Sequence, residues 1–543
     1  MRYAVFLFFL LMALVTSCSR PQVDAVFYNG KVYTVDSVFS VQQAFAVKNG
    51  RIVAVGSDEV IRRYDAPKYV DLMGKPVYPG FYDAHCHFYG YGVDLAKISL
   101  TGTTSFETVL DTLSKYRDRR FMGWVFGRGW DQNDWPVREY PDRSRLDLLF
   151  PDVPVFLMRI DGHAALVNGK ALELAGVDAS TRVEGGEIIL RDGVPTGLLI
   201  DNALELVRSR ISAPDRQAEI DALIKAQQNC FRAGLTTVVD AGLEPGVIHL
   251  IDSLQKAGLL KMRINAMVSY SPANLARYRQ SGPYSSDRLN VCSFKLYADG
   301  ALGSRGACLL HPYYDLPGHH GFLLHSVDSL RDAVQQVYDI GFQLNTHCIG
   351  DSANRLLLKL YGGVLKGQND RRWRIEHAQV LNLSDLRLFS DFSVIPSVQP
   401  VHATSDMYWA EDRLGAERLK GAYAYKKLLK SRGILAAGSD FPVEDINPLN
   451  GFHAAVVRKD HKGFPDDGFL VSEALSREEA LKAMTIWAAY SSFEEENRGS
   501  LEKGKWADFV ILEEDIMTGS ADRLFSIPVL ETWVGGEKVS VLR

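Results

Sequence analysis

The chain has 543 residues, a formal net charge of −5, 46% hydrophobic residues and 23% charged residues. These values are those of an ordinary globular protein with a sizeable core, and they exclude a largely disordered chain. The small negative charge leaves no basic stripe, so we expect no nucleic-acid partner. The length leaves room for several domains, although a single α/β barrel can occupy more than half of such a chain.

The first twenty residues, MRYAVFLFFLLMALVTSCSR, predict an export signal. Arg2 precedes an apolar run over residues 4–15, which is too short to span a bilayer comfortably but suits the core of a signal peptide. The stretch VTSC resembles a bacterial lipobox, which is cut before the cysteine so that Cys18 can be lipidated. We therefore expect residues 1–17 to be a lipoprotein signal, and the mature protein to be anchored through Cys18 at the periplasmic side or the cell surface of a bacterium. A plain signal peptide or a buried first strand is the alternative.

Five further cysteines follow at irregular spacings: Cys86, Cys230, Cys292, Cys308 and Cys348. Their odd number and their spacing do not form a disulfide framework, even for an exported protein. Cys86 and Cys348 each adjoin a histidine, but neighbouring residues of a strand face opposite sides. We therefore expect both to be buried apolar thiols.

Both ends of the chain predict antiparallel sheet. Residues 18–76 contain short β-branched and aromatic runs broken by Asn-Gly, the strongest short hairpin signal. Residues 491–543 contain GKWADFVILEEDI and VLETWVGGEKVSVLR, which predict short strands with a Gly-Gly turn. Since neither end is long enough to bury a good core alone, we predict that they combine into one small β-domain.

The middle of the chain, residues 77–490, alternates strand-like and helical patterns, which is typical of βαβ units and a parallel sheet. Eight segments have strand character: 75–85, 234–242, 261–270, 291–300, 341–348, 371–380, 392–400 and 434–443. Helical stretches fit between them, several ending in glycine: 215–234, 327–341, 352–367 and 423–433. We predict an α/β fold with a (β/α)8 barrel. Residues from about 90 to 211 are too many for one crossover, so they predict an inserted subdomain.

Polar residues stand where the predicted strands end. In DAHCH, His85 and His87 share one face of a strand, and two such imidazoles can chelate a metal ion. Barrel enzymes work from the carboxyl ends of their strands, where further candidates lie: Lys295 in SFKLYADG, His347 in LNTHCIGD, His377 in RIEHAQ and Asp440 in AAGSDFPV. Singly, either later histidine could be a hydrogen-bonded core residue, and the aspartate could cap a helix. Their recurrence at equivalent positions predicts a metal centre.

Lys295 is the most informative of these residues, because apolar strand residues flank it. Burial inside a barrel would disfavour its charged form and lower its pKa. A neutral lysine amine can add carbon dioxide to become a carbamate, an anionic ligand able to bridge two cations. An ion pair with Asp299 at the barrel mouth is the alternative.

Several motifs carry a family resemblance. DAHCH, KLYADGALGSR, THCIGD, IEHAQ and GSDFPVE resemble the amidohydrolase superfamily. More narrowly, DGHAALVN, QPVHATSDMYWAEDRLG and NPLNGFHAAVVR resemble its YtcJ-like, or amidohydrolase-3, branch, which includes N-substituted formamide deformylases. The resemblance runs from NGKVYTVD to GKWADFVIL, nearly the whole mature chain. It implies a metal-dependent hydrolase on a distorted TIM barrel, with a β-sandwich formed from both chain ends.

The resemblance also implies roles for the polar residues at the strand ends. His85 and His87 would bind the more buried metal ion together with Asp440. His347 and His377 would bind the more exposed ion, and the carboxylated lysine would bridge both. These ligands suit divalent zinc, manganese, iron or cobalt; we expect one or two ions, with zinc favoured by its availability.

The expected reaction is hydrolysis of a carbon–nitrogen bond, other than a peptide bond, in a small amide, N-acyl or N-formyl substrate. A hydroxide held between cations about 3.5–4 Å apart would attack the carbonyl group. Asp440 would take the water's proton and return it to the departing nitrogen. An ester, lactone or phosphoester substrate is the first alternative, and a ligand-capturing lipoprotein without catalysis is the second. The sequence does not set the oligomeric state, and a homodimer is an open alternative.

Five residues are candidate substrate contacts outside the metal set. Trp130 lies in FGRGWDQNDWP, Asp161 and His163 lie in RIDGHAALVN, and Gln399 and His402 follow the seventh predicted strand. Ordinary tertiary packing is the alternative for the aromatic Trp130. The family motif DGHAALVN favours a role for His163.

Overall fold

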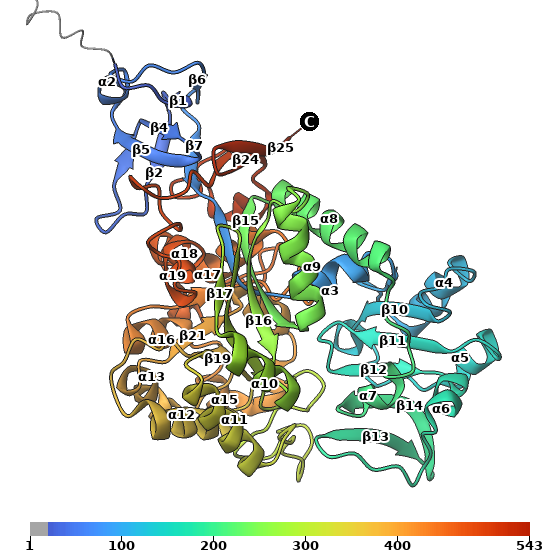
Figure 1. Ribbon diagram of the computed structural model, residues 1–543. Coiled ribbons are helices and arrows are strands. Elements are labelled where there is room, and N and C mark those ends of the chain that lie inside the picture. The colour runs from blue at the N-terminus through green and yellow to red at the C-terminus, as the bar shows by residue number, and fades with distance from the viewer. Residues whose placement is uncertain (1–19, 543) are drawn as a thin grey trace, which may run out of the picture.

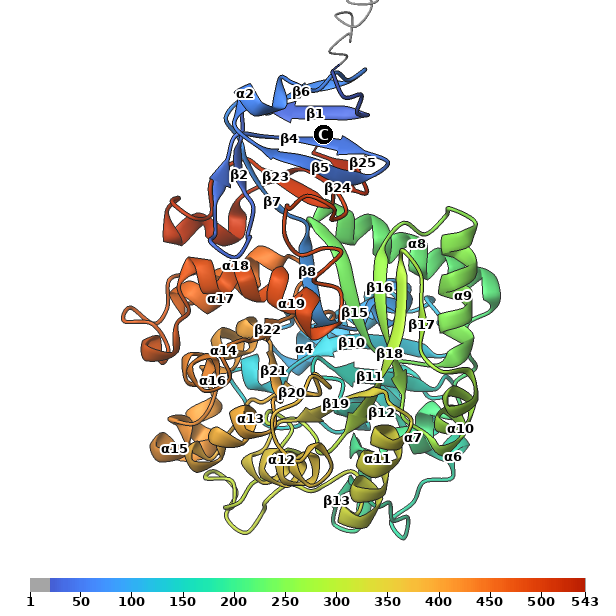
Figure 2. The ribbon, with the colours of Figure 1, turned by 60° about the vertical axis from the view of Figure 1, so that its left-hand side comes forward.

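The computed structural model describes residues 20–542, so the predicted signal peptide and Cys18 lie outside the described residues. A barrel occupies the middle of the molecule, a β-domain stands at one end, and an inserted sheet lies at the side (Figure 1). In the turned view of Figure 2, the blue and red strands of the two chain ends lie together above the barrel. Within residues 20–542, no helix has both the length and the apolar character needed to cross a membrane.

Eight parallel strands form the barrel. They are β8 (Phe81–Cys86), β15 (Leu235–Leu243), β16 (Arg263–Ser269), β18 (Leu289–Tyr297), β19 (Gln343–Cys348), β20 (Arg374–His377), β21 (Ile395–Val398) and β22 (Ala436–Ala437). Each strand pairs with the next in this order. Beyond β22, the Asp440 N–H donates to the His85 carbonyl at 2.7 Å, and the His87 N–H donates to the Phe441 carbonyl at 2.8 Å. The sheet is therefore nearly closed, and the predicted distorted TIM barrel is confirmed.

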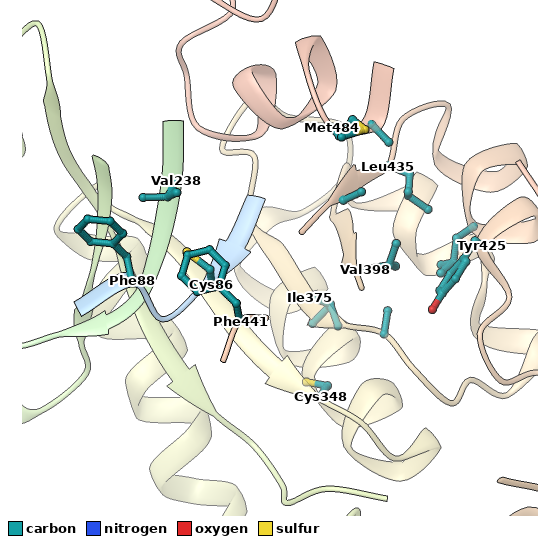
Figure 3. Close-up of a cluster of buried hydrophobic side chains, with 14 of the residues drawn as sticks. Cys86, Phe88, Val238, Cys348, Ile375, Val398, Tyr425, Leu435, Phe441 and Met484 are labelled. Atoms are coloured by element: carbon teal, nitrogen blue, oxygen red, sulfur yellow. The ribbon is translucent and has the colours of Figure 1, made fainter. Parts of the chain in front are cut away.

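Helices cover the outside of the barrel. They are α8 (Arg216–Arg232), α9 (Pro245–Lys256), α10 (Pro272–Ser281), α11 (Val327–Asp339), α12 (Asp351–Leu365), α13 (Arg387–Asp391), α14 (Pro400–Asp406), α15 (Ala410–Leu419), α16 (Tyr425–Arg432), α17 (Pro448–Val457), α18 (Arg477–Ala483) and α19 (Ile486–Ser491). Apolar side chains from helices and strands form one buried cluster, which includes Val238 and Ile375 (Figure 3). Cys86 and Cys348 lie in this cluster as free thiols, as expected for buried apolar cysteines.

The first predicted strand, residues 75–85, is in fact two strands of different sheets. β7 (Pro76–Pro79) belongs to the β-domain, whereas β8 belongs to the barrel. Gly80 separates them, and a Cβ atom there would lie 2.3 Å from Oγ1 of Thr236 in β15. Only glycine lets the chain pass this close to its neighbour. The predicted boundary between residues 76 and 77 therefore falls inside β7, and the chain changes sheet at Gly80.

The β-domain has two sheets. The first contains only N-terminal strands, in the order β5 (Arg51–Gly56), β4 (Ala44–Lys48), β1 (Ala25–Tyr28) and β6 (Tyr69–Asp71). The second mixes both chain ends, in the order β25 (Glu537–Val541), β24 (Val529–Val534), β23 (Phe509–Leu512), β7, β2 (Lys31–Tyr33) and β3 (Val41–Gln42). Phe27 and Phe45 of the first sheet pack on Phe509 and Trp533 of the second. The two chain ends thus share one core.

The insert between β8 and β15 is built on a six-stranded mixed sheet. Its strands follow the order β13 (Gly186–Arg191), β14 (Val194–Asp201), β12 (Ala164–Val167), β11 (Val155–Arg159), β10 (Val125–Trp130) and β9 (Ile98–Ser99). Its helices, with the one that leads into it, are α3 (Phe88–Asp94), α4 (Phe106–Lys115), α5 (Ser144–Leu149), α6 (Gly169–Ala175) and α7 (Leu204–Arg208). Apolar clusters cover both faces of the sheet, which makes the insert a folded unit beside the barrel.

Candidate metal centre

Five strand ends bring polar side chains to one mouth of the barrel. His85, Lys295 and His347 lie in the last residues of β8, β18 and β19. His377 ends β20, and Asp440 follows β22 by three residues. All five are buried, with at most 5% of each residue exposed. Their shared position at the carboxyl ends of parallel strands explains how residues so far apart in sequence meet.

Asp440 contacts both histidines of the DAHCH motif. Its Oδ1 lies 3.2 Å from His87 Nε2 and 3.5 Å from His85 Nε2. His85, His377 and Asp440 each offer one ligand atom, and these atoms lie within 4.8 Å of one another. Burial acts to raise the pKa of Asp440, but the close contact with His87 and the other neighbouring imidazoles hold it well below the usual value. The carboxylate is therefore ionised, as a metal ligand must be.

The backbone is strained at two of these positions. His377 has a φ of 73° and Asp440 has a φ of 62°, in the left-handed region that costs a non-glycine residue about 1–2 kcal/mol. Such strain concentrates at functional sites, where the surrounding structure holds it. Asp440 does not cap a helix, because α17 begins after Asn447, whose side chain accepts the capping hydrogen bond. Helix capping, the alternative role of Asp440, is thereby excluded.

Lys295 points into the same centre. Its Nζ lies 3.2 Å from His85 Nε2, and burial lowers its pKa to about 8. The described residues place no carboxylate within ion-pair distance of this ammonium group. Asp299, the alternative partner, instead accepts backbone N–H groups from Cys308, Ile349 and Gly350 at 2.8–2.9 Å. Among the described residues, Lys295 is therefore a buried amine without a counter-ion.

His347 and His377 complete the group. Their ring centroids are 4.6 Å apart, and the His377 ring lies 4.9 Å from the His85 ring. Burial holds the pKa of His347 and His377 well below the usual value, and lowers the pKa of His85 to about 4. All three imidazoles are thus neutral at neutral pH, which is the form that binds metal.

The donor set fits a divalent metal ion. Within residues 20–542, Nδ1 of His377 and Oδ1 of Asp440 are buried and have no hydrogen-bond partner. Buried polar atoms are rarely left unpaired, and a bound ion is one of the recognised reasons. Neutral imidazoles and an ionised carboxylate are ligands that first-row divalent metals accept. The residues present therefore fit a metal centre.

Sequence reasoning missed one residue of this centre, Glu376. Its carboxylate accepts a hydrogen bond from His85 Nδ1 and another from Arg374 at 2.9 Å. Burial acts to raise the pKa of Glu376, but Arg374 and His85 lower it to about 2. The sequence did hold a signal for Glu376. Arg374 and Glu376 stand two residues apart in a predicted buried strand, and charged side chains are almost never fully buried unless they are paired.

Three of the predicted substrate contacts line a cavity at the barrel mouth. Asp161, His163 and His402 are wall residues of this cavity, whose volume is about 1310 Å³. His402 Nε2 lies 3.8 Å from Asp440 Oδ2, and the His163 ring centroid lies 5.0 Å from that of His347. Barrel and insert therefore enclose the candidate metal centre together.

The other two predicted contacts do not line this cavity. Trp130 is buried in the core of the insert, where its indole N–H donates to the Leu157 carbonyl at 2.8 Å. Gln399 is 2% exposed and lies against the barrel, with Nε2 3.4 Å from the Ser397 carbonyl. Packing, the alternative stated for Trp130, describes its position, and Gln399 is likewise packed against the barrel.

The fold and the site define a class, a hydrolase that carries a metal centre in a TIM barrel. Residues 68–540 match the family model described as "Amidohydrolase family", so the chain belongs to that family. This is a family of metal-dependent hydrolases, and the chain lies in its YtcJ-like branch.

Three relatives and one solved structure resemble almost the whole chain. The chain is 35% identical to protein LONG AFTER FAR-RED 3 of Arabidopsis thaliana, over 95% of this chain and 91% of that protein. It is 32% identical to the proposed amidohydrolase YtcJ of Bacillus subtilis (strain 168), over 95% and 99%. It is 28% identical to N-substituted formamide deformylase of Arthrobacter pascens, over 94% and 97%. A crystal structure of an uncharacterized metal-dependent hydrolase from Pyrococcus horikoshii OT3 superposes with a TM-score of 0.75 at 28% identity, covering 92% of this chain and 99% of that one.

Proposed function

We propose that this protein hydrolyses a carbon–nitrogen bond, other than a peptide bond, in a small amide, N-acyl or N-formyl compound. The observation that carries the proposal is the meeting of the six predicted ligands at one barrel mouth, with Asp440 3.2 Å from His87 and 3.5 Å from His85. The similarity to a formamide deformylase over 94% of the chain supports the choice of bond.

The metal ligands of the proposal are the side chains that meet at Asp440. His85, His87 and Asp440 would hold one divalent ion, and His347 and His377 a second. Zinc is the expected metal, because nitrogen and oxygen donors suit it and it is commonly available. Lys295, buried 3.2 Å from His85, would bridge the two as its N6-carboxylated form.

A bound divalent ion supplies a Lewis acid and lowers the pKa of water from 15.7 to about 7. Asp440 is the proposed general base and then general acid. Its ionised carboxylate accepts a proton at Oδ1 or Oδ2 and returns it to the nitrogen that leaves. An amine anion leaves poorly, so this return of the proton is the step that favours C–N cleavage at neutral pH. His402 Nε2 lies 3.8 Å from Asp440 Oδ2, beside the same carboxylate.

The cavity has room for a small substrate. Its volume of about 1310 Å³ exceeds that of a drug-sized ligand pocket, and the insert forms one of its walls. Residues of the insert, among them Asp161 and His163, face the mouth of the barrel across this space. Substrate that enters would lie between the insert and the ligands of the barrel.

The proposal is tested with matched substrates. Metal-reconstituted protein should hydrolyse N-formyl or N-acyl amines faster than the corresponding esters, lactones and phosphoesters, relative to the uncatalysed rates. A preference for esters or phosphoesters would assign the site to the alternative reaction. Bound metal without turnover of any of these compounds would favour a ligand-capturing protein.

We further propose that the protein is exported and anchored through Cys18, on the basis of the sequence alone. Mass spectrometry of the mature protein should find a lipid-modified terminus at Cys18, and Cys18→Ser should release the protein from membranes. An unmodified terminus at another residue would contradict this proposal.

A further inference from the structure

The insert brings a second histidine–carboxylate pair to the edge of the candidate metal centre. His163 Nδ1 lies 2.5 Å from Asp201 Oδ1. The Asp201 side chain has no exposed surface, whereas the His163 side chain is 17% exposed and faces the cavity. The His163 ring lies beside His347, with ring centroids 5.0 Å apart. An imidazole from outside the barrel therefore stands next to a predicted metal ligand.

The local backbone holds both residues in place. His163 directly precedes β12 and Asp201 ends β14, and these strands are antiparallel neighbours. The Asp201 N–H donates to the His163 carbonyl at 2.8 Å. The His163 N–H donates to Asp161, whose carboxylate is itself bound by the buried guanidinium of Arg159. His163 is thus held at its backbone by Asp161 and at its ring by Asp201.

Two glycines of the barrel make room for the Asp201 carboxylate. Gly300 and Gly306 lie in the segment that follows β18, and a Cβ atom on either would lie 2.2 Å from Asp201 Oδ2. Neither glycine has a left-handed φ, so the backbone itself would accept alanine at both positions. All three atoms nearest to a Cβ at Gly300 belong to the Asp201 carboxyl group. Gly300 and Gly306 therefore leave free the space that the Asp201 carboxylate of the insert occupies.

We propose that His163 is a catalytic residue whose Nε2 accepts a hydrogen bond from a protonated oxygen or nitrogen at the reacting carbon of the substrate, and that Asp201 is its positioning residue. Nδ1 is committed to Asp201, and none of the hydrogen bonds of the described residues involves Nε2. A base held by a buried carboxylate is a recurrent arrangement for fixing one nitrogen of an imidazole toward substrate. The inference rests on the proposed function, because it places a carbonyl substrate beside His347.

The hydrogen bond to Asp201 fixes both the tautomer and the orientation of the ring. Nδ1 donates its proton to the Asp201 carboxylate, so the lone pair lies on Nε2. Removing the carboxylate would free the ring to rotate.

The test compares His163→Ala, Asp201→Ala, Gly300→Ala and the double variant Asp201→Ala/Gly300→Ala. The substrate is the amide that the wild-type protein hydrolyses fastest or, if it hydrolyses none, the best ester. Asp147→Asn is the matched control, since Asp147 accepts the Gly169 N–H at 2.6 Å elsewhere in the insert. Bound metal, melting temperature and the NMR signal of the His163 Nδ1–H in 15N-histidine-labelled protein are measured beside kcat and KM.

Each single variant should lower kcat about 10²-fold, with bound metal and melting temperature close to those of Asp147→Asn. The double variant should be no slower than Asp201→Ala, because the carboxyl atoms that clash with the methyl group introduced at position 300 are then gone. The Nδ1–H signal should be lost in Asp201→Ala and shifted in Gly300→Ala.

Unchanged kcat in His163→Ala, or additive losses in the double variant, would overturn the inference. Wild-type protein that cleaves esters but no amide would contradict the proposed function alone, since the variants can still be compared on the ester.

Discussion

His85 and Glu376 share a hydrogen bond at the centre of the barrel, where neither side chain has any exposed surface. The carboxylate accepts the hydrogen bond that Nδ1–H donates, so Nε2 is the nitrogen that faces Asp440 and Lys295. A carboxylate or carbonyl behind a metal-binding histidine fixes its tautomer and raises its basicity. Glu376 in turn is held by Arg374, which also donates to the Ala84 carbonyl at 2.6 Å.

Replacing Glu376 should therefore weaken metal binding without removing a ligand. We expect Glu376→Gln to lower metal affinity about 10–100-fold, because the amide orients His85 less firmly than the carboxylate does. Competition with a chelator of known affinity measures the loss. Glu473→Gln is the control, since Glu473 is also buried but pairs with Lys427 on the outside of the barrel. Equal metal affinities in the two variants would show that Glu376 has no role in the centre.

Asp440→Asn should separate metal binding from proton transfer. The amide keeps the size of the carboxylate and one oxygen, but it cannot accept and return a proton. We expect kcat to fall about 10²–10⁴-fold in protein that still contains metal. Metal analysis and steady-state kinetics on the same preparation decide the matter. A kcat close to that of the wild-type protein would remove Asp440 from the role of general base.

Lys295→Ala should remove the proposed bridge between two ions. We expect the bound metal to fall well below the wild-type content, and short carboxylic acids added to the buffer to restore part of the metal and of the activity. Lys97→Ala is the matched control, because Lys97 is also a cavity-lining lysine but is paired with Asp94 at 2.6 Å. Full metal content in Lys295→Ala would contradict a bridging role.

The meeting of the polar residues at the barrel mouth could be predicted from the sequence because the carboxyl ends of parallel barrel strands lie together, whatever the loops between them do. Glu376 escapes prediction because strict alternation places it on the opposite face from His377. The left-handed φ of 73° at His377 breaks that alternation, so both side chains reach the interior. Asp201 escapes because its partner lies 38 residues away and the pairing depends on how the insert folds against the barrel.

Other differences between sequence and structure have equally local causes. The sequence predicts the first strand as one element because no residue within it except Gly80 signals a change of sheet. The turn-rich aromatic stretch around Trp130 predicts a substrate contact, but this residue belongs to strand β10 and packs inside the insert. Periodicity indicates which faces of an element are apolar, and it cannot say which of two cores a side chain enters.

The junction between barrel and β-domain should make stability depend on pH. Asp508, 5% exposed, binds Arg263 of β16 through two hydrogen bonds of 2.6 and 2.9 Å. Burial acts to raise the pKa of Asp508, but Arg263 lowers it below the usual value of 3.8. A carboxyl group whose pKa is lower in the folded state stabilises above its unfolded pKa, and this contribution is lost as the pH falls through the folded value.

We therefore expect Asp508→Asn to reduce the free energy of unfolding by about 3–5 kcal/mol at pH 7, because it leaves the Arg263 charge buried and unpaired. The difference from the wild-type protein should shrink as the pH falls below 3.8, because the carboxyl group of the wild-type protein then becomes protonated first in the unfolded state and, at lower pH, in the folded state. Urea unfolding followed by tryptophan fluorescence suits the measurement, since Trp506 lies under the Arg263 guanidinium at 4.7 Å. A difference that stays constant from pH 7 to pH 3 would mean that the ion pair contributes nothing, and that the variant acts through packing alone.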